Sequence, residues 1–201
     1  MVYFNFFTFR ILVVFIVFVN IELSRAQQLE VVDFLQITGD IELLPTEKKI
    51  VVTAQYQFHI LKKTDSVFLD AKNIQLRGAS NSKSPIEIKQ TTDKIWFINS
   101  FKGGRTYSIS IQYEAQPQQT LYFFEDQIWT QGQGKETSHW LPSIDDVNDK
   151  IVFNLNVTAP KKYTVLANGV CIQIEEKNQG AQGGTKVWSY KMSQPMSSYL
   201  L

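Results

Sequence analysis

The sequence has little of what a self-contained catalytic or metal site needs. Among its 201 residues Cys171 is the only cysteine, so the chain can form neither an internal disulfide nor a cysteine-based zinc site. There are two histidines, His59 and His139, and His139 has no other histidine or cysteine near it in sequence. Ser138 and Ser143 lack the G-x-S-x-G context of a nucleophilic serine. These absences argue against a hydrolase that works alone.

Clustered charge and helical periodicity are also missing. The net charge is +1 and the Lys and Arg residues form no block, which argues against nucleic-acid binding. After residue 30, no long stretch has apolar residues at helical spacing. Hydrophobic residues nevertheless make up 44% of the chain and aromatic residues 13%, which indicates a folded domain with a sizeable core.

The N-terminus has the pattern of a cleavable signal peptide. Arg10 precedes the apolar residues 11–19, and Ser24-Arg25-Ala26 supplies small residues for cleavage. The apolar run is shorter than the ~20 residues that a membrane-spanning helix needs. We therefore expect residues 1–26 to be removed and residues 27–201 to be exported, to the periplasm or outside the cell, without a membrane span. An uncleaved anchor that starts at Val2 is the alternative.

The rest of the chain alternates between apolar and polar residues, the period of half-buried β-strands. We expect an all-β domain, an antiparallel β-sandwich or saddle, because many short strands are separated by turn residues. The longest predicted strands cover residues 50–60, 106–113, 151–158 and 188–192, and shorter ones cover 31–37, 66–70, 74–77, 86–90, 94–99, 121–124 and 164–167.

Two local predictions follow from the same patterns. Asn168-Gly169 stands between two apolar runs and predicts a hairpin turn, because both residues tolerate positive φ. Cys171 lies in the alternating run 170–174, which predicts a small buried side chain.

Few polar residues suggest chemistry by themselves. His59 falls on the polar face of a predicted strand, so we expect it to face solvent, and His139 falls in a polar turn. Asp145 and Asp146 could form a carboxylate dyad. The interpretation that we favour is that they cap a turn before the next strand, because Asp side chains accept hydrogen bonds from nearby backbone amides.

One segment carries more information than the others. Residues 130–134 read Thr-Gln-Gly-Gln-Gly, and residues 139–143 read His-Trp-Leu-Pro-Ser just before the Asp145-Asp146 pair. Downstream, the chain reads Ala-Asn-Gly at 167–169 and Pro-Met-Ser-Ser-Tyr-Leu at 195–200. In this order the segments resemble the N-terminal β-domain of the aminopeptidase N family of zinc metallopeptidases, the gluzincin aminopeptidases. The resemblance covers roughly residues 30–201 and departs from the family at Val147-Asn148, where a proline is usual.

The resemblance implies a role in anchoring substrate. In that family a Gln-x-Gln or Gln-x-Glu pair helps to hold the free amino end of a peptide. Carried over, Gln133 accepts a hydrogen bond from the substrate α-ammonium through its side-chain carbonyl, and Gln131 supports it or contacts the adjacent backbone. Gly132 and Gly134 are expected to leave room for the ligand.

The resemblance also implies what this chain does not contain. The family's zinc helix, with H-E-x-x-H and a distant Glu, belongs to the catalytic domain that follows. We therefore expect no metal and no catalytic residue here, zinc in that domain, and the domain itself as the partner in cis. Leu201 falls in an apolar segment, and we expect a truncated chain that is inactive alone. The alternative is a non-catalytic, secreted β-sandwich module that binds a peptide, a glycan or another protein.

Overall fold

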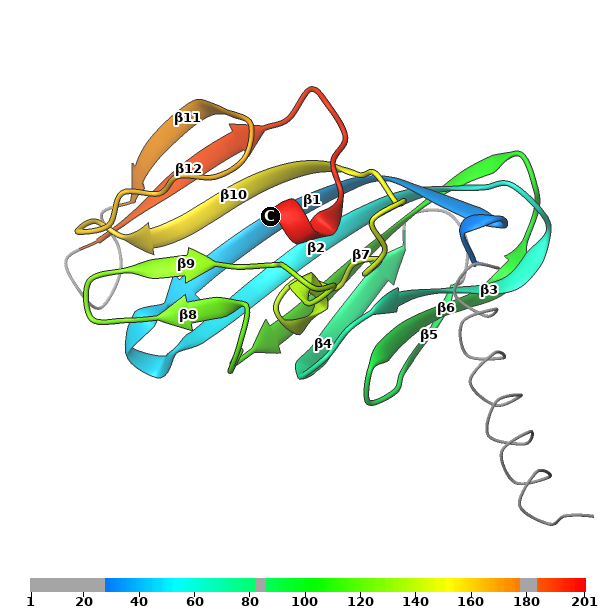
Figure 1. Cartoon of the computed structure of the whole chain (residues 1–201), viewed down its shortest axis with the longest axis horizontal. Helices are drawn as coiled ribbons and strands as arrows, with labels where there is room; N and C mark the ends of the chain where they lie inside the picture. The colour runs from blue at the N-terminus through cyan, green and yellow to red at the C-terminus, as the bar shows by residue number, and fades with distance from the viewer. Residues whose placement is uncertain (1–27, 82–85, 178–183) are drawn as a thin grey trace, which may run out of the picture.

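The computed structural model describes residues 28–81, 86–177 and 184–201, and the predicted signal peptide, residues 1–26, lies outside them (Figure 1). The described part is mostly β-structure, with only short 3-10 helices between the strands. The strands are β1 (Val32–Leu44), β2 (Lys49–Ile60), β3 (Thr64–Asp70), β4 (Ile74–Asn81), β5 (Glu87–Gln90), β6 (Lys94–Phe101), β7 (Arg105–Ala115), β8 (Leu121–Phe123), β9 (Ile128–Thr130), β10 (Val152–Pro160), β11 (Val170–Lys177) and β12 (Thr185–Lys191). The 3-10 helices are η1 (Pro45–Glu47), η2 (Thr137–His139) and η3 (Ser198–Leu200).

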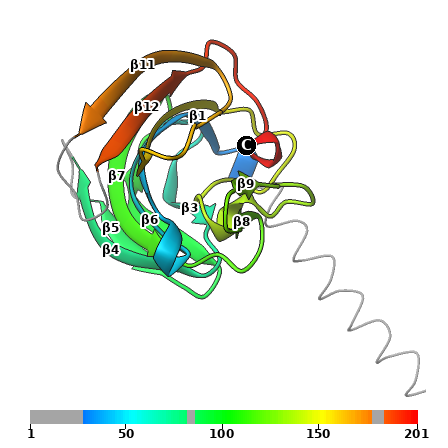
Figure 2. The same ribbon diagram turned by 90° about the vertical axis from the view of Figure 1, so that its left-hand side faces the viewer.

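The strands form three open sheets. The largest has seven strands in the order β11-β12-β10-β1-β2-β7-β4, and smaller sheets are formed by β3-β6-β5 and by β8-β9. Figure 2 shows that the large sheet curves, with β8, β9 and η3 on its concave side. The prediction of antiparallel strands is right for every described pair except one, because β1 and β10 run parallel, from Gln36 opposite Val152 to Glu42 opposite Thr158.

Alternation along the strands builds the core. On β2 every second side chain is buried: Ile50, Val52, Ala54, Tyr56, Phe58 and Ile60. Phe58 lies at the centre of an aromatic cluster, 5.3 Å from Phe34 and 5.7 Å from Phe101 between ring centroids. Burial of each large apolar side chain contributes roughly 1.5–3 kcal/mol to stability. The long predicted strands therefore form where the pattern places them.

Two buried tyrosines connect the large sheet to the segment that follows η2. Tyr56 on β2 donates its hydroxyl to the Pro142 carbonyl at 2.8 Å, and Tyr113 on β7 donates to the Trp140 carbonyl at 3.0 Å. Burial raises the pKa of both hydroxyls well above the ordinary value, so both remain donors. Residues 140–142 are thus held against the sheet.

The prediction of a strand at 164–167 and a hairpin at Asn168-Gly169 is wrong. Residues 163–167 have no regular structure, and the Val165 carbonyl accepts a hydrogen bond from the Tyr190 hydroxyl at 2.7 Å. Gly169 does adopt a left-handed φ of 94°, and a Cβ there would lie 2.5 Å from the Lys191 carbonyl oxygen. The turn therefore exists, but it leads into β11, whose antiparallel partner is β12.

Cys171 is exposed, contrary to the prediction from its alternating run. It lies on β11 at the edge of the large sheet, where every side chain is exposed. The alternating run does form a strand, but no described element covers it. The structure also shows β9, which the sequence did not predict, and β1 continues well past residue 37.

No helix in the described part of the chain is long and apolar enough to cross a membrane.

Candidate functional site

The Gln131-Gly132-Gln133 segment lies in the loop between β9 and η2. The backbone N–H of Gln131 donates to the Thr120 carbonyl at 2.8 Å, which fixes the start of the loop next to β8. Both glutamine side chains are exposed, and Gln131 Nε2 lies 3.5 Å from Gln133 Oε1. The two predicted site residues are therefore adjacent and accessible, with the amide of one directed at the carbonyl of the other.

The two glycines of the loop have different environments. A Cβ on Gly132 would lie 2.5 Å from Thr137 Oγ1 and 2.8 Å from the Tyr199 carbonyl oxygen. The expectation that Gly132 leaves room for a ligand is therefore wrong, because the protein itself fills that space. Gly134 has a left-handed φ of 78°, and a Cβ there would meet no described atom within 4 Å. Gly132 is required by packing and Gly134 by backbone conformation.

Close packing of Gly132 ties the loop to the C-terminal segment. Thr137 Oγ1 donates to the Ser198 carbonyl at 2.9 Å, and Ser198 Oγ donates to the Ile144 carbonyl at 2.9 Å. All of these residues are buried. The Gln-x-Gln segment and the Pro-Met-Ser-Ser-Tyr-Leu segment, which the sequence singled out separately, thus meet in space.

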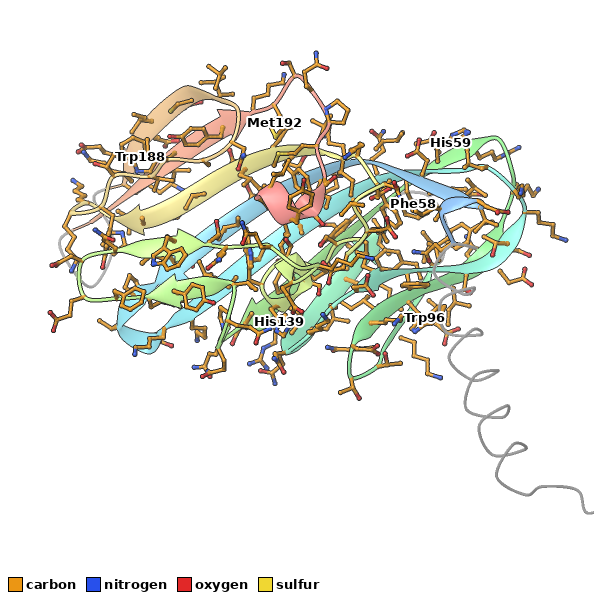
Figure 3. The ribbon with its side chains drawn as sticks, viewed as in Figure 1. Phe58, His59, Trp96, His139, Trp188 and Met192 are labelled. Atoms are coloured by element: carbon orange, nitrogen blue, oxygen red, sulfur yellow. The ribbon has the colours of Figure 1, made fainter. Side chains whose placement is uncertain are left out.

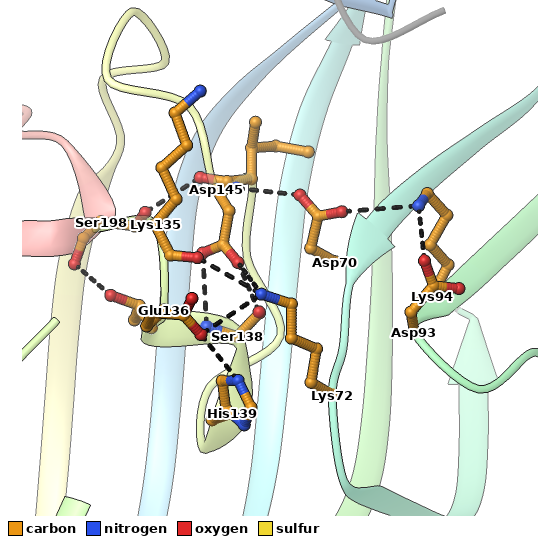
Figure 4. A network of polar contacts seen from close by, with 12 residues as sticks. Asp70, Lys72, Asp93, Lys94, Lys135, Glu136, Ser138, His139, Asp145 and Ser198 are labelled. Atoms are coloured by element: carbon orange, nitrogen blue, oxygen red, sulfur yellow. Dashed lines mark hydrogen bonds and ion pairs between the residues drawn. The ribbon is translucent and has the colours of Figure 1, made fainter. Parts of the chain in front are cut away.

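Below the loop, a polar network joins residues far apart in the chain: Asp70, Lys72, Glu136, Ser138, His139 and Asp145 (Figure 4). Asp145 accepts hydrogen bonds from the Ser138 backbone N–H at 3.3 Å and from the Ser138 hydroxyl. The Asp145 backbone N–H donates to Asp70 Oδ2 at 3.0 Å, and Asp70 also pairs through its backbone with Ser143. The segment from η2 to Asp145 is therefore fastened to the end of β3.

Lys72 is the cation next to Glu136 and Asp145. Its Nζ lies 3.4 Å from Glu136 Oε2 and 3.7 Å from Asp145 Oδ2, and its backbone N–H donates to the Ser138 carbonyl at 2.9 Å. The pKa of Asp145 is raised to about 6, chiefly by burial and also by the nearby Asp70, although the Ser138 hydrogen bonds and Lys72 act to lower it. The balance leaves a carboxyl group that titrates close to neutral pH.

His139, which the sequence places in a polar turn, lies in the 3-10 helix η2 and is buried. Its Nε2 lies 2.7 Å from Glu136 Oε2, and burial, with Lys72 nearby, lowers its pKa although Glu136 raises it. His59 is half-buried on β2, 3.0 Å from Thr106 Oγ1, and lies well apart from His139 (Figure 3). The two histidines therefore form no common site.

The turn-capping interpretation is confirmed for Asp146, whose Oδ1 accepts the Asn148 backbone N–H at 2.9 Å. It is wrong for Asp145, which is buried and accepts from Ser138 in η2, seven positions earlier in the chain. Across the described ranges, no group of three His, Cys, Asp or Glu side chains is arranged to hold a metal ion. The residues present here do not fit a zinc site.

The sequence did not point to Lys72 or Asp70 as site residues. Lys72 lies 63 positions before Lys135, whose carbonyl oxygen is 3.5 Å from Lys72 Nζ. It follows β3 in a short turn with no recognisable motif. Long-range contacts bring that turn to the loop: the pairing of Asp70 with Ser143 and the hydrogen bond from the Lys72 backbone N–H to the Ser138 carbonyl.

A cavity of about 530 Å³ lies next to the loop and is mostly apolar. Its walls include Leu43 from β1, Leu155 from β10, Trp129 and Thr130 from β9, and Val165 and Leu201. The cavity reaches the residue just before Gln131, but the polar atoms of Gln131 and Gln133 belong to the exposed loop and not to its walls.

The family model of the peptidase M1 N-terminal domain matches residues 35–200. No curated protein matches the chain. Among solved structures, an M1 zinc metallopeptidase mutant from Deinococcus radiodurans, bound to a Tyr-Ser-Ala substrate, is similar with a TM-score of 0.76 at 17% identity. That match covers 84% of this chain and 41% of the other.

Two further structures have the same fold. Legionella pneumophila aminopeptidase A in complex with aspartic acid matches with a TM-score of 0.74 at 16% identity, over 84% of this chain and 20% of that one. Yeast LTA4 hydrolase in complex with bestatin matches with a TM-score of 0.67 at 16% identity, over 84% of this chain and 28% of that one. This chain therefore spans less than half the length of each of these proteins.

Proposed function

Since the chain belongs to the peptidase M1 N-terminal domain family, we propose that it is the substrate-anchoring β-domain of an exported, zinc-dependent aminopeptidase. The family membership confirms the resemblance seen in the sequence. The observation that carries the proposed role is the exposure of Gln131 and Gln133 side by side on a loop that is fixed to the sheet at its start and to η2 at its end.

In this proposal, the side-chain carbonyl of Gln133 accepts a hydrogen bond from the α-ammonium of a peptide. A carbonyl oxygen has two lone pairs, so Gln133 Oε1 can accept from both Gln131 Nε2 and a substrate. The amide of Gln131 then keeps the oxygen of Gln133 turned toward a fixed direction. Because glutamine is neutral, the negative charge opposite the ammonium group comes from the catalytic domain.

The chemistry itself is assigned to that other domain. Zinc bound there would supply an activated water, with a glutamate of the zinc helix as the general base. This chain would bind and orient the amino end of the substrate, and by itself it would be inactive. Export rests on residues 1–26, and the assignment of the curved sheets to a β-sandwich or saddle rests on the alternation of the strands and on the fold of the similar structures.

The test uses the complete gene product and a peptide or aminoacyl-anilide substrate. We expect Gln133→Ala to lower kcat/KM by an amount on the order of one hydrogen bond to a charged group, ~1.5–3 kcal/mol. Gln57→Ala, at an exposed position on β2, is the matched control and should leave kcat/KM unchanged. Equal kcat/KM of the Gln133→Ala protein and the wild type would remove the anchoring role of Gln133, whereas a complete gene product without peptidase activity would favour the non-catalytic module.

A second measurement concerns the metal. Residues 27–201 expressed alone should contain no zinc above trace by elemental analysis. Stoichiometric zinc in that preparation would contradict the assignment of the metal site to another domain.

A further inference from the structure

Lys72 contacts three residues that hold the loop of residues 131–136 in place. Its Nζ is 3.5 Å from the Lys135 carbonyl oxygen, 3.4 Å from Glu136 Oε2 and 3.7 Å from Asp145 Oδ2. Its backbone N–H donates to the Ser138 carbonyl at 2.9 Å. Lys72 thus contacts the chain on both sides of Glu136, and Figure 4 shows its ammonium group between the loop and Asp145.

Glu136 holds the end of the loop in place through three side-chain contacts. Besides Lys72, its carboxylate contacts Gln119 Nε2 at 3.0 Å and His139 Nε2 at 2.7 Å. The start of the loop is fixed by the backbone hydrogen bond from Gln131 to Thr120. Gln119 and Thr120 are neighbours in sequence, so both ends of the loop are attached to the same short segment before β8.

Between these fixed ends, the loop contains two residues with left-handed backbone. Gly134 has φ of 78° and Lys135 has φ of 67°. A left-handed φ costs a residue other than glycine roughly 1 kcal/mol, so Lys135 adopts it only where other contacts hold it. The contact of Lys72 Nζ with the Lys135 carbonyl is one of these, together with the ion pair at Glu136.

The charge of Lys72 is compensated inside the protein. Glu136 and Asp145 both lie within 4 Å of its Nζ, at 3.4 and 3.7 Å. An ammonium group balanced by two carboxylates does not repel a second ammonium group at the exposed face of the loop. Lys72 can therefore support a site for a cationic group without opposing its binding.

We infer that Lys72, acting through Glu136 and the Lys135 carbonyl, is a positioning residue that holds the Gln133 side chain in the orientation needed to receive a substrate ammonium group. The inference rests on the proposed function of Gln133. Lys72 itself does not touch the substrate, and its effect is to reduce the conformational entropy that the loop loses when the substrate binds.

The experiment is a double-mutant cycle in the complete gene product, with Lys72→Met, Gln133→Ala and the double variant. We expect Lys72→Met to lower kcat/KM roughly three- to ten-fold in the wild-type background and to have almost no effect in the Gln133→Ala background. Lys72→Arg keeps a cation between the two carboxylates and should restore most of the activity.

Lys62→Met is the matched control. Lys62 also forms an ion pair, 3.2 Å from Glu30, but on an exposed part of the surface away from the loop. This variant should retain wild-type kcat/KM. Thermal unfolding shows whether each variant is folded. If Lys72→Met does not fold, kcat/KM of Lys72→Arg is compared with the wild type instead.

Hydrogen exchange provides a readout that does not depend on activity. Amides of residues 131–136 should exchange faster in Lys72→Met than in the wild type, while amides of β2 should be unchanged.

The outcomes separate the two proposals. If Gln133→Ala leaves kcat/KM unchanged, the anchoring function fails. If Gln133→Ala is impaired but Lys72→Met is silent, or is equally harmful in both backgrounds, the anchoring function stands and the positioning role of Lys72 is overturned.

Discussion

Ser138 binds the carboxylate of Asp145 twice, through its backbone N–H at 3.3 Å and through its hydroxyl. Both residues are buried, and they join the two ends of the segment that contains Trp140, Leu141 and Pro142 and packs on the sheet. A buried carboxylate is costly unless it is hydrogen-bonded, so Ser138 is what makes an ionised Asp145 tolerable at this position.

Ser138→Ala should therefore destabilise the domain. Removal of a hydrogen bond to a buried charged group is expected to lower the free energy of unfolding by ~1.5–3 kcal/mol, measured by urea denaturation at pH 7.5. Ser143→Ala is the matched control, because Ser143 Oγ is buried without a hydrogen-bond partner in the described structure. That variant should lose much less stability. Equal losses for the two serines would show that the Ser138 hydroxyl is not the stabilising group.

The buried carboxyl group of Asp149 should make the domain less stable as pH rises toward neutrality. Burial raises its pKa from 3.8 to about 7, with Asp33 and Asp146 adding to the rise. Well below pH 3.8 the Asp149 carboxyl group is protonated in both the folded and the unfolded state. As pH rises from 4 to 7, the unfolded state releases its proton first, so this group lowers the free energy of unfolding across that window.

Asp149→Asn removes this effect. We expect the variant to match the wild type near pH 4 and to be more stable at pH 8 by roughly 2–4 kcal/mol, measured by urea denaturation across the pH range. Asp65→Asn, at an exposed position on β3, should change stability by no more than ~0.5 kcal/mol at either pH. If Asp149→Asn were less stable than the wild type at pH 8, the Asp149 carboxylate would have to make a stabilising contact when ionised.

The two loop glycines should respond differently to alanine. In Gly132→Ala the new methyl group would lie 2.5 Å from Thr137 Oγ1 and 2.8 Å from the Tyr199 carbonyl, so backbone must move. We expect a loss of stability of ~2 kcal/mol or more. Gly134→Ala meets no described atom within 4 Å and carries only the cost of its left-handed φ, about 1 kcal/mol. Thermal unfolding of the two variants shows which substitution lowers stability more. A smaller loss of stability for Gly132→Ala than for Gly134→Ala would contradict the packing role of Gly132.

How far the sequence could predict this structure depends on the range of each interaction. Period-two alternation predicts β2, β7 and β10 because one face of each is buried against the core. The same alternation on β11 could not predict that Cys171 is exposed, since exposure depends on which element covers the strand. The parallel pairing of β1 with β10 has no local signature, because the two strands are far apart in the chain.

The candidate site divides in the same way. Gln131 and Gln133, the proposed anchoring residues, could be singled out from a short motif, because they are neighbours in sequence. Lys72 and Asp70 could not, because they reach the loop through contacts with residues more than 60 positions away in the chain, such as the hydrogen bond from Lys72 Nζ to the Lys135 carbonyl and the bond from the Asp145 N–H to Asp70. The role of Gly132 was mistaken for a similar reason: its close neighbour Tyr199 lies near the far end of the chain.

Tyr56 and Tyr113 give a last test, of how residues 140–142 are held. Their hydroxyls come from adjacent strands and reach the Pro142 and Trp140 carbonyls at 2.8 and 3.0 Å. Both rings are fully buried, so Tyr→Phe at either position leaves a buried carbonyl without its partner. We expect each substitution to lower the free energy of unfolding by ~1–3 kcal/mol in urea denaturation.

The double variant should lose less than the sum of the single losses, because the two hydroxyls hold one segment and its release removes both contacts together. Tyr122→Phe is the control, since the Tyr122 hydroxyl has no hydrogen bond to another described residue, and it should change stability by no more than ~0.5 kcal/mol. Full additivity of Tyr56→Phe and Tyr113→Phe would mean that Trp140 and Pro142 are held independently, and that the segment beneath the Gln133 loop is not released as one unit.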